Sequence, residues 1–518
     1  MLGRCRAVGL VGLNGHVVEV EADVAAGLPA FTLVGLPDAS LAEARDRVRA
    51  AAANAGCPLP ARRITVNLSP AALPKTGTAF DLAVAAALLA ASGQVPADSV
   101  AVRVHLGELG LDGRVRPVRG VLPAVVAAVR AGYHRLVVPA ANAAEARLVP
   151  GAEVTAVRHL ADVVALHRGE PPPTLDLPED DPASTAAVAA AGAGRGSDLD
   201  LADVVGQAEG RHAVEVAAVG GHHLLLVGPP GAGKTMIAER LPGILPDLTP
   251  EEALEVTAVH SVAGTFDAAG GLRRRPPFEA PHHTTTVAAL VGGGSGLPRP
   301  GAASRAHRGI LFLDEAPEFS VRALEGLRQP LEHGELVIHR AMGAARFPAR
   351  FQLVLAANPC PCGMASGKGD LCSCSPLARR RYLARLSGPL LDRVDLQVEV
   401  RAVSRVQLSE PALPESSAVV AVRVAAARAA QRERFEGLPW SLNGEAPGAW
   451  LRGKWRLPAP ATRDLDQALD RGRLSIRGYD RVLRVALSLA DLAGRERPDR
   501  DDVGRALLLR CRGLAVAA

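Results

Sequence analysis

A glycine-rich segment that follows a short apolar run constrains this chain of 518 residues more than any other feature. Residues Leu224–Val227 are continuously apolar, as in a buried parallel strand. The next residues, GPPGAGKT, fit the pattern G-x-x-x-x-G-K-[ST] at every fixed position. They are Gly228, Pro229, Pro230, Gly231, Ala232, Gly233, Lys234 and Thr235. Because glycines let backbone N–H groups turn inward around an anion, the segment predicts a polyphosphate-binding loop.

The last two residues of this loop have distinct predicted roles. Lys234 would reach the β- and γ-phosphates of a nucleotide, and the Thr235 hydroxyl would ligate Mg²⁺. The alternative is a glycine-rich turn that contains a lysine by coincidence. That alternative does not account for the strand before the loop or for the helix expected to start near Lys234. The sequence therefore predicts ATP and Mg²⁺ as ligands.

Polar residues also follow two further apolar runs. Asp314 and Glu315 come directly after Ile310–Leu313, at the strand end where open α/β sheets place their ligand chemistry. Asp314 would hold Mg²⁺, directly or through water, and Glu315 would orient and deprotonate the attacking water. The alternative is a pair that caps the next helix. A third run, FQLVLAAN, ends in Asn358, a candidate to bind the water or the γ-phosphate.

Two insertions are expected in this nucleotide-binding core. Residues 235–313 are more than a strand–helix crossover needs, and the excess includes FEAPHHTTT. His282 and His283 in this stretch could bind a metal, but no third ligand is nearby, so polar loop residues are the favoured interpretation. The second insertion predicts a β-hairpin of residues 336–340 and 345–347, just before the third strand.

Four of the seven cysteines lie within 15 residues, directly after Asn358. They form the pattern C-x-C-x₉-C-x-C and are Cys360, Cys362, Cys372 and Cys374. Four thiolates brought together by a glycine-rich loop predict a structural Zn²⁺ site with no open coordination position. The spacing of one residue within each pair is tighter than usual, so reduced cysteines without a metal remain the alternative.

Length and charge set broader limits. A chain of this length predicts two or three domains, and its net charge of +5 hints at nucleic acid without establishing it. The first residues, MLGRCRAVGLVGL, have a short apolar run like a signal peptide, but strand-like alternation follows and no cleavage site is evident. No apolar run approaches about 18 residues. We therefore expect a soluble, cytoplasmic protein that does not contact a membrane.

The order of these features predicts the domain organisation. Residues 1–168 are expected to form a compact α/β domain, and residues 169–197, rich in proline, acidic and small residues, a flexible linker. Residues 198–401 would form the nucleotide-binding core with the cysteine loop at 360–374. Residues 402–518 are expected to be helical.

Several stretches along the chain are similar to one known family. In the first domain they are VGLPDASLAEARDRVRAA, ITVNLSPAALPKTGTAFDL and HLGELGLDGRVRPVRGVLP, and in the core they are FEAPHHTTT, LFLDEAPEFS and LRQPLEHGELVIHRA. Together they resemble the ComM/YifB group of magnesium-chelatase-like AAA+ ATPases, over nearly the whole chain outside the linker. The resemblance implies an α/β fold with a Lon-protease-like N-terminal domain, an AAA+ core with magnesium-chelatase-type inserts, and a C-terminal helical lid.

The resemblance to Lon protease does not extend to its catalytic residues. Lon-type proteolysis needs a serine that is activated by a lysine. Where the Lon pattern PKDGPSAG would lie, this chain has PKTGTAFD, so Ala79 takes the position of the serine. Where Lon has GGLKEK, this chain has RGVLPA, so Leu122 takes the position of the lysine. We therefore expect the N-terminal domain to be non-proteolytic.

The family resemblance also implies roles near the nucleotide. The D-x-x-x-V-x-G-Q stretch of AAA+ proteins lies near the adenine, which here implicates Val205, Gly206 and Gln207. In magnesium-chelatase relatives the arginine of the L-L-x-R pattern reaches the ATP of a neighbouring subunit, which maps onto Arg393. The alternative for Arg393 is a surface salt bridge with Asp392 or Asp395.

A second sensor arginine is expected at the start of a strongly amphipathic helix near residue 477. Arg477 falls at the position of the family's second sensor arginine on the lid. Arg481 and Arg484 follow at helical spacing, so an assignment displaced by one turn is the alternative.

The resulting hypothesis is an ATP-hydrolysing ring, expected to be a homo-hexamer because an arginine supplied by a neighbour functions only in an assembly. The family resemblance implies that the motor drives DNA branch migration in recombination. Arg340, Arg346 and Arg350, with His339 beside them, are candidate phosphate contacts on the hairpin, and Arg379, Arg380 and Arg381 are a second basic group. One rival is a chelatase-like motor that drives a partner protein, and the other is a Lon-like peptidase.

Overall fold

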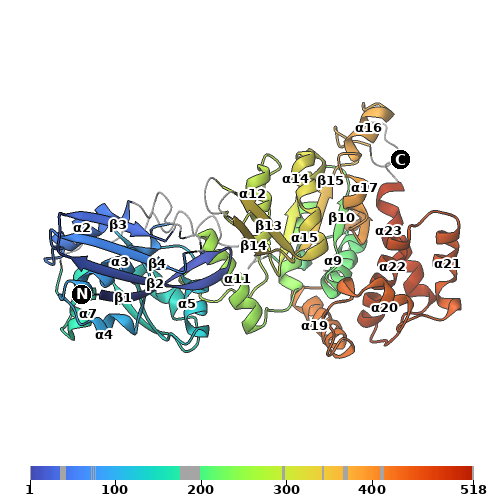
Figure 1. Cartoon of the computed structure of the whole chain (residues 1–518). Helices are drawn as coiled ribbons and strands as arrows, with labels where there is room; N and C mark the ends of the chain where they lie inside the picture. The colour runs from blue at the N-terminus through green and yellow to red at the C-terminus, as the bar shows by residue number, and fades with distance from the viewer. Residues whose placement is uncertain are drawn as a thin grey trace.

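A computed structural model describes the chain at residues 2–35, 43–71, 73, 75, 77–175, 199–294, 298–340, 343–365, 372–408 and 414–515. Most of the predicted linker, residues 176–197, lies outside these ranges. The described residues form an N-terminal sheet with its helices, a second sheet in the middle of the chain, and a group of C-terminal helices (Figure 1).

The N-terminal sheet has seven strands in the order β3-β4-β2-β1-β5-β8-β9. These strands are β1 (Leu2–Val11), β2 (Asn14–Ala25), β3 (Ala30–Val34), β4 (Arg63–Ser69), β5 (Val104–His105), β8 (Arg135–Pro139) and β9 (Glu153–Val157). Buried and more exposed residues alternate along β4, as expected for a strand with one face against the core. β1 and β2 form a long antiparallel hairpin, so the apolar start of the chain is a central strand of this sheet.

Helices and short elements complete the N-terminal region. They are α2 (Ala44–Asn54), η1 (Thr78–Phe80), α3 (Asp81–Ala91), α4 (Ala97–Ala101), β6 (Glu108–Leu109), β7 (Val115–Arg116), α5 (Val121–Arg130), η2 (Ala140–Asn142), α6 (Ala143–Ala146) and α7 (Leu160–Arg168). Every residue of α3 is buried, and this helix packs on β1 and β2. Its alanine-rich, apolar sequence suits this position because it carries little polar side-chain surface.

The second sheet has five strands, all parallel, in the order β11-β12-β15-β10-β16. They are β10 (Leu224–Val227), β11 (Phe278–Glu279), β12 (Ile310–Leu313), β15 (Gln352–Ala357) and β16 (Leu396–Glu399). All residues of β10, β12 and β15 are buried, which is typical of parallel strands covered on both faces. The predicted strands at Leu224–Val227 and Ile310–Leu313 are thereby confirmed.

Helices and one hairpin surround this sheet. The elements are η3 (Leu201–Asp203), α9 (Ala208–Gly220), α10 (Lys234–Glu239), η4 (Leu241–Ile244), α11 (Pro250–Ala263), α12 (Val287–Val291), α13 (Ala302–Arg305), η5 (Ala316–Glu318), α14 (Val321–Gly326), α15 (Arg328–His333), β13 (Glu335–Arg340), β14 (Gly343–Pro348), α16 (Pro376–Leu383) and α17 (Gly388–Leu391). β13 and β14 pair antiparallel, which confirms the predicted hairpin.

Among the described residues after 401, every regular element is a helix. They are α18 (Arg405–Leu408), α19 (Ser417–Arg434), η6 (Asn443–Glu445), α20 (Gly448–Arg452), α21 (Ala459–Asp470), α22 (Ile476–Leu492) and α23 (Arg500–Ala515). α22 reaches the edge of the sheet where β10 begins, because the Ser488 hydroxyl lies 2.8 Å from His222 Nε2. α23 reaches the start of β16 through Arg510, which donates to the carbonyl of Val394 at 2.6 Å.

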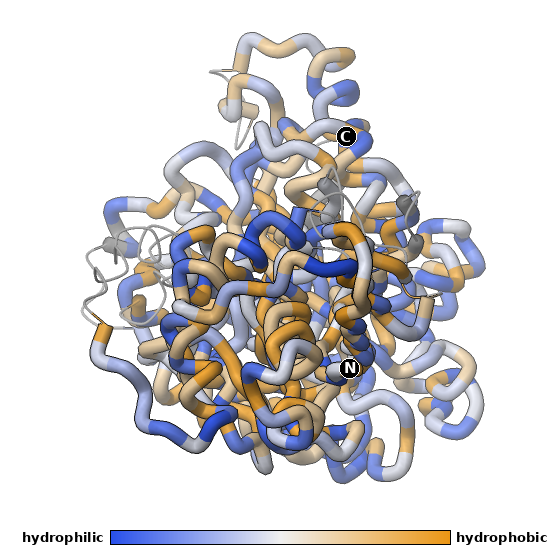
Figure 2. The backbone as a smooth tube through the Cα atoms, turned by 60° about the vertical axis from the view of Figure 1, so that its left-hand side comes forward, coloured by the Kyte–Doolittle hydropathy of each residue, from blue (hydrophilic) through white to orange (hydrophobic). Residues whose placement is uncertain are grey.

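The two sheet regions meet through α5 and α11, which lie side by side in the middle of the molecule (Figure 1). The contact includes a backbone hydrogen bond of 3.3 Å from Gly120 to Ser261 and burial of Ala258 against the N-terminal core. Hydrophobic stretches of the chain gather toward the interior, and hydrophilic ones are frequent on the outer turns (Figure 2). No helix within the described residues has the length and apolar composition needed to cross a bilayer.

A buried ion pair in the N-terminal region provides a test of this packing. Asp81 at the start of α3 has a fully buried side chain and accepts two hydrogen bonds from Arg47 of α2, at 2.6 and 3.0 Å. The Arg47→Ala variant leaves this carboxylate unpaired, so we expect it to lower the local stability of α3 by about 3–5 kcal/mol. Native-state hydrogen exchange of the α3 amides measures this loss.

The matched control is Arg45→Ala, which removes an exposed pair with the neighbouring Asp46. Solvent screens that pair, so the exchange of α3 should stay close to that of the wild type. Equal protection of α3 in both variants would show that the Arg47–Asp81 pair does not stabilise the packing of α2 on α3.

Candidate nucleotide and metal sites

The phosphate-binding loop leaves the sheet at the end of β10, its second strand from one edge. The backbone N–H of Gly228 bonds to the Ala357 carbonyl at 3.1 Å, and a Cβ at Gly228 would lie 2.1 Å from the Val400 carbonyl oxygen. Only glycine therefore fits where the loop passes between β15 and β16. Gly231 and Gly233 have φ of +75° and +90°, and added Cβ atoms there would meet open space. These two glycines provide the left-handed turns of the loop.

Lys234 begins α10 and is nearly buried within the loop. Its Nζ atom donates to the carbonyls of Gly228 and Pro229 at 2.7 and 2.9 Å, and to Asn358 Oδ1 at 3.1 Å. Burial lowers the pKa of this amine, while the charges of Asp314 and Glu315 oppose the shift. The lysine thus lies at the centre of the predicted site, with the end of β15 beside it.

Thr235 and Asp314 meet although 79 residues separate them. The Thr235 hydroxyl donates to Asp314 Oδ2 at 2.6 Å, and Asp314 Oδ1 accepts the backbone N–H of Glu315 at 2.9 Å. A hydroxyl and a carboxylate are hard oxygen donors of the kind that Mg²⁺ prefers. The pair therefore fits the predicted Mg²⁺ site.

Glu315 differs from its neighbours in its backbone conformation and in its partner. Its φ and ψ of 50° and 44° place it in the left-handed region, which is uncommon for residues other than glycine and recurs at functional sites. Its carboxylate Oε2 lies 3.4 Å from Nδ1 of His283, which follows β11. His282 turns to Thr284 instead, at 2.9 Å. His283 therefore belongs to the same strand-end cluster as Glu315, a contact that the sequence did not reveal.

Asn358 lies directly after β15, as predicted, and α16 covers it from outside. The Asn358 side chain accepts from Lys234, and its backbone forms a hydrogen bond that lowers the pKa of Tyr382. Burial is the larger effect and raises the pKa of Tyr382 to about 12, with help from the carboxylates of Glu318 and Glu315. Tyr382 therefore stays a neutral phenol beside the site.

The segment expected near the adenine contacts the loop from the other side. Gln207 is buried, and its Nε2 donates to the carbonyls of Ala232 at 2.9 Å and Arg401 at 2.6 Å. Gly206, next to Val205, has φ of +72° and accepts from Gln407 at 3.0 Å. The amide of Gln207 thus ties the phosphate-binding loop to the chain that leaves β16.

Arg393 lies at the N-terminal ends of the strands, opposite the ends where this cluster lies. It precedes β16, where Asp395 and Leu396 donate their backbone N–H groups to the carbonyl of His223 at the start of β10. Each of these strands has four residues, about 13 Å at the usual rise. Arg393 is nearly buried and forms an ion pair with Glu332 of α15, rather than with Asp392 or Asp395 as in the predicted alternative.

Arg477 lies in the first turn of α22 and is exposed. Its charge, with those of Arg328 and Arg481, adds to burial in lowering the pKa of Arg393. Arg481 pairs with the buried Asp395, and Arg484 donates to the Ala446 carbonyl at 2.8 Å. Among these three arginines of α22, Arg477 therefore retains an exposed side chain, and it lies in the cluster around Arg393.

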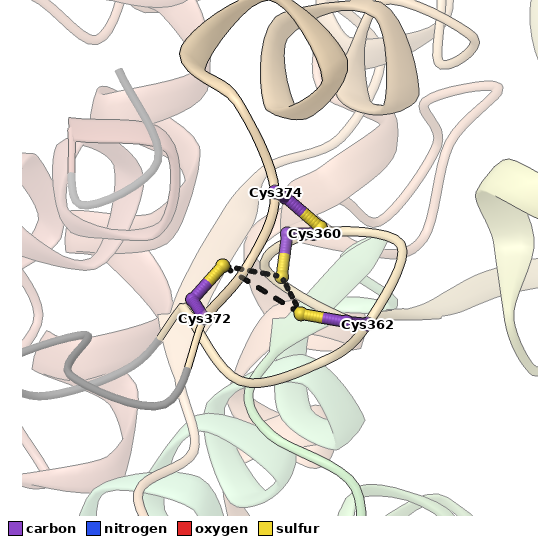
Figure 3. A group of neighbouring side chains, drawn as sticks. All are labelled: Cys360, Cys362, Cys372 and Cys374. Carbon is purple, nitrogen blue, oxygen red and sulfur yellow. Dashed lines mark hydrogen bonds between the residues drawn. The ribbon is translucent and has the colours of Figure 1, made fainter.

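The four clustered cysteines come together after β15 (Figure 3). Their sulfur atoms all lie within 4.8 Å of one another. Cys360 Sγ lies 3.3 Å from Cys362 Sγ and 3.6 Å from Cys372 Sγ. A tetrahedral zinc with Zn–S bonds of about 2.3 Å separates its sulfur atoms by about 3.8 Å. The cluster, including Cys374, therefore has the dimensions and the donors of a four-thiolate zinc site.

The thiols of this cluster differ in acidity. A hydrogen bond from the backbone N–H of Met364, followed by one from Cys360, lowers the pKa of Cys362 to about 6, whereas burial raises the pKa of Cys360 to about 11. A thiolate is the form that binds zinc, so this thiol is prepared for coordination at neutral pH. Cys360 is fully buried and the other three are partly exposed. Residues 366–371 of the loop lie outside the described residues.

The hairpin predicted to contact DNA lies against the N-terminal region. A Cβ at Gly12, in the turn between β1 and β2, would lie 2.4 Å from the Arg346 carbonyl oxygen. The Arg346 side chain is exposed and pairs with Glu335 at 3.1 Å. His339 and Arg350 are also exposed, and the side chain of Arg340 lies outside the described residues. The hairpin thus has basic side chains at its surface, but Glu335 partly neutralises Arg346, and the turn at Gly12 covers part of its backbone.

The two positions of the Lon dyad lie in different elements. Ala79 is in η1 and Leu122 is in the first turn of α5, where it is buried. Neither side chain offers a nucleophile or a base. The structure therefore gives no support to the rival hypothesis of a Lon-like peptidase.

A phosphate-binding loop on a parallel strand, with an acidic pair and an asparagine at the ends of the neighbouring strands, defines a nucleotide-binding α/β protein of the AAA+ class. Comparison with known families supports this class. Residues 200–408 match the family described as magnesium chelatase, subunit ChlI, residues 20–142 match subunit ChlI of Mg-chelatase, and residues 414–510 match its C-terminal part.

Individual relatives extend over nearly the whole chain. An uncharacterized protein of Mycobacterium tuberculosis is 54% identical over 99% of both chains. The protein YifB of Escherichia coli is 42% identical over 93% of this chain and 92% of its own. Competence protein ComM of Haemophilus influenzae is 41% identical over 96% of this chain and 95% of its own. The chain belongs to the ComM/YifB family of magnesium-chelatase-like AAA+ ATPases.

Similarity to Lon protease is more limited. The Lon protease of Mycolicibacterium smegmatis is 31% identical over 32% of this chain and 22% of its own. The predicted resemblance to Lon is therefore confirmed as a partial one. Membership of an AAA+ family implies ATP and Mg²⁺ as ligands.

The contact between His283 and Glu315 generates a prediction about turnover. If His283 positions the carboxylate, His283→Ala should lower kcat for ATP about tenfold, because a displaced base loses its geometry, and should leave KM nearly unchanged. His283→Gln offers an amide donor at a similar place and should recover part of the loss. Steady-state ATP hydrolysis by purified protein provides the measurement.

His282→Ala is the control in the same loop, because His282 bonds to Thr284 rather than to Glu315. Its kcat should remain close to that of the wild type. A similar loss in the His282 and His283 variants, without recovery in His283→Gln, would mean that the loop acts only as a structural element.

Proposed function

We propose that this protein is an ATP-hydrolysing motor that works as a homo-hexameric ring on DNA. The observation that carries the proposal is the division of the predicted catalytic groups between the two ends of the strands in one parallel sheet. At the carboxyl ends of the strands, Lys234 bonds to Asn358 and Thr235 bonds to Asp314. Arg393 lies at the opposite, N-terminal ends of the strands, so it would not reach a nucleotide bound by its own chain.

At the carboxyl ends of the strands each group has a chemical task. The backbone of residues 228–235 would surround the phosphates, and Lys234 would exchange the loop carbonyls for the β- and γ-phosphates. Thr235 and Asp314 would hold Mg²⁺, which would supply positive charge beside the phosphate oxygens. Glu315 would accept the proton of the attacking water, and Asn358 would orient that water or the γ-phosphate.

The ring follows from the position of Arg393 and its neighbours. The Arg393 guanidinium, at the N-terminal ends of the strands, can contribute to catalysis only if a second copy places its phosphate-binding loop there. When that copy docks, Arg393 would leave Glu332 for the γ-phosphate, and the exposed Arg477 beside it would provide a second positive charge. The C-terminal helices, which pack at these same strand ends, would then cover a neighbour's nucleotide rather than their own.

DNA is the proposed track because a relative of similar length is a competence protein and because the chain is basic overall. The exposed Arg346 and Arg350 are candidate phosphate contacts on a hairpin that leads into β15. In this role the motor would drive DNA branch migration during recombination, in the cytoplasm. A chelatase-like motor that acts on a partner protein without DNA is the second candidate, and the family description favours it.

We further propose that the four cysteines hold a structural Zn²⁺ ion. The observation that supports it is the closeness of four sulfur atoms, which all lie within 4.8 Å of one another and would supply four thiolate ligands. Residues 1–168, 198–401 and 402–518 would form the N-terminal domain, the ATPase core and the helical lid, joined by the linker at 169–197.

Two substitutions separate nucleotide binding from hydrolysis. Lys234→Ala removes the cation that faces the phosphates, so it should abolish tight binding and turnover of ATP. Glu315→Gln keeps the shape of the side chain but loses the base, so it should bind ATP normally and turn it over at least about 10²-fold more slowly.

ATP turnover by the wild type, measured with and without single-stranded DNA, tests whether the motor acts on DNA. Turnover that DNA leaves unchanged would favour the partner-protein candidate.

Mixed assemblies test the position of Arg393. The Arg393→Ala chain should lose about 10³-fold in turnover, as other arginine fingers do. Mixing it with the Lys234→Ala chain should restore part of the activity, because a mixed ring contains sites with an intact loop that faces an intact arginine. Co-assembly is checked by tagging one chain and isolating the other with it. Co-assembled mixtures that stay inactive at every ratio would contradict an action between subunits.

A further inference from the structure

The loop that carries the first two cysteines touches the phosphate-binding loop. Gly363 has φ of +78°, and a Cβ at this position would lie 2.5 Å from both Cδ and Cγ of Pro230. Pro230 is a residue of the motif itself, and its ring is rigid. The backbone N–H of Gly363 bonds to the Cys360 carbonyl at 3.0 Å, which closes a turn between the metal-ligating cysteines and this contact.

The same short segment also begins at the nucleotide sensor. Asn358 bonds to Lys234 at 3.1 Å, and the fully buried Cys360 follows two residues later. Residues 358–363 thus contact the phosphate-binding loop at two points, at Lys234 and at Pro230. Any displacement of this segment changes the position of both.

The segment has no regular secondary structure of its own. The described residues between β15 and α16, which are 358–365 and 372–375, form no helix or strand. Thiol groups are weak hydrogen-bond donors and acceptors, so the contacts among the sulfur atoms of Cys360, Cys362 and Cys372 hold the segment weakly. A bound cation would replace these contacts with four strong bonds and would join residues 360 and 374 across the loop.

We propose that a divalent, thiophilic cation bound by the four cysteines holds Gly363 against Pro230 and thereby sets the affinity of the phosphate-binding loop for ATP. The proposal rests on the proposed ATP binding and zinc binding, and it adds that the metal supports the nucleotide site through a defined contact. Removal of the cation by a chelator would release the segment. The motor would then bind nucleotide weakly although all residues of its phosphate-binding loop are intact.

The first experiment compares three forms of the full-length wild type: zinc-loaded, chelated, and chelated with Zn²⁺ added back. Elemental analysis gives the zinc content, and titration with a fluorescent ATP analogue gives the affinity. We expect about one Zn²⁺ per chain, a loss of affinity of about tenfold on chelation, the equivalent of one weakened charge-assisted hydrogen bond, and recovery with zinc. Absence of zinc uptake, or equal affinity in all three forms, would overturn the proposal.

The second experiment breaks the contact but keeps the metal. Gly363→Ala adds a methyl group that Pro230 cannot accommodate, so it should retain one Zn²⁺ per chain and still lose about tenfold in ATP affinity. Gly437→Ala is the matched control, because its φ of +74° carries the same backbone strain and its added Cβ would meet nothing within 4 Å. Equal affinities in the two variants would overturn the contact.

These outcomes separate the proposal from the function on which it rests. A zinc-loaded wild type that binds no ATP would overturn both the nucleotide site and its metal support. A zinc-loaded wild type that binds ATP, with an affinity that neither chelation nor Gly363→Ala changes, would overturn the metal support alone.

Discussion

The parallel register of four neighbouring strands is the constraint on which the rest of this structure depends. β11, β12, β15 and β10 run in one direction, so residues that follow them in sequence meet at one edge in space. This places Glu315, Asn358 and Lys234, which come from distant parts of the chain, around one point. β10, β12 and β15 are buried along their whole length, and a charged residue within them would be costly. The charged groups of the site therefore follow these strands instead of lying within them.

The same parallel register places Arg393 and the phosphate-binding loop of one chain at opposite ends of the strands. Arg393 and the helices that contain Arg477 and Arg510 are built onto the starts of β10 and β16, one strand length from the phosphate-binding loop. A rigid sheet cannot bring groups at the two ends of its strands together. In the proposed function, a nucleotide site that uses an arginine from these strand ends needs a second copy, and hydrolysis would be linked to the contact between copies.

Much of this arrangement could be predicted from the sequence, where local patterns carry it. β10 and β12 are continuous apolar runs that end in polar residues, and the glycine-rich motif between strand and helix has a fixed spacing, so both were predicted to the residue. The start of the chain was harder, because the short apolar run of β1 resembles a signal peptide until its pairing with β2 is known.

Contacts between distant residues could not be predicted in this way. The pairing of Arg393 with Glu332, the approach of His283 to Glu315, and the packing of Gly363 on Pro230 each depend on the tertiary fold, and no local spacing encodes them. Arg477 was assigned by family resemblance alone, and helical spacing left Arg481 and Arg484 as alternatives. Its position in the arginine cluster around Arg393 became evident only when α22 was placed at the start of β16.

We infer that the nucleotide site is completed by a neighbouring copy. A structure of the assembled protein with Mg²⁺ and a non-hydrolysable ATP analogue would decide this. We expect a ring in which the Arg393 guanidinium lies at hydrogen-bonding distance, about 3 Å, from the γ-phosphate that is bound by Lys234 of the adjacent copy. An assembly in which Arg393 remains paired with Glu332 of its own chain, far from every nucleotide, would show that the copies do not share a site.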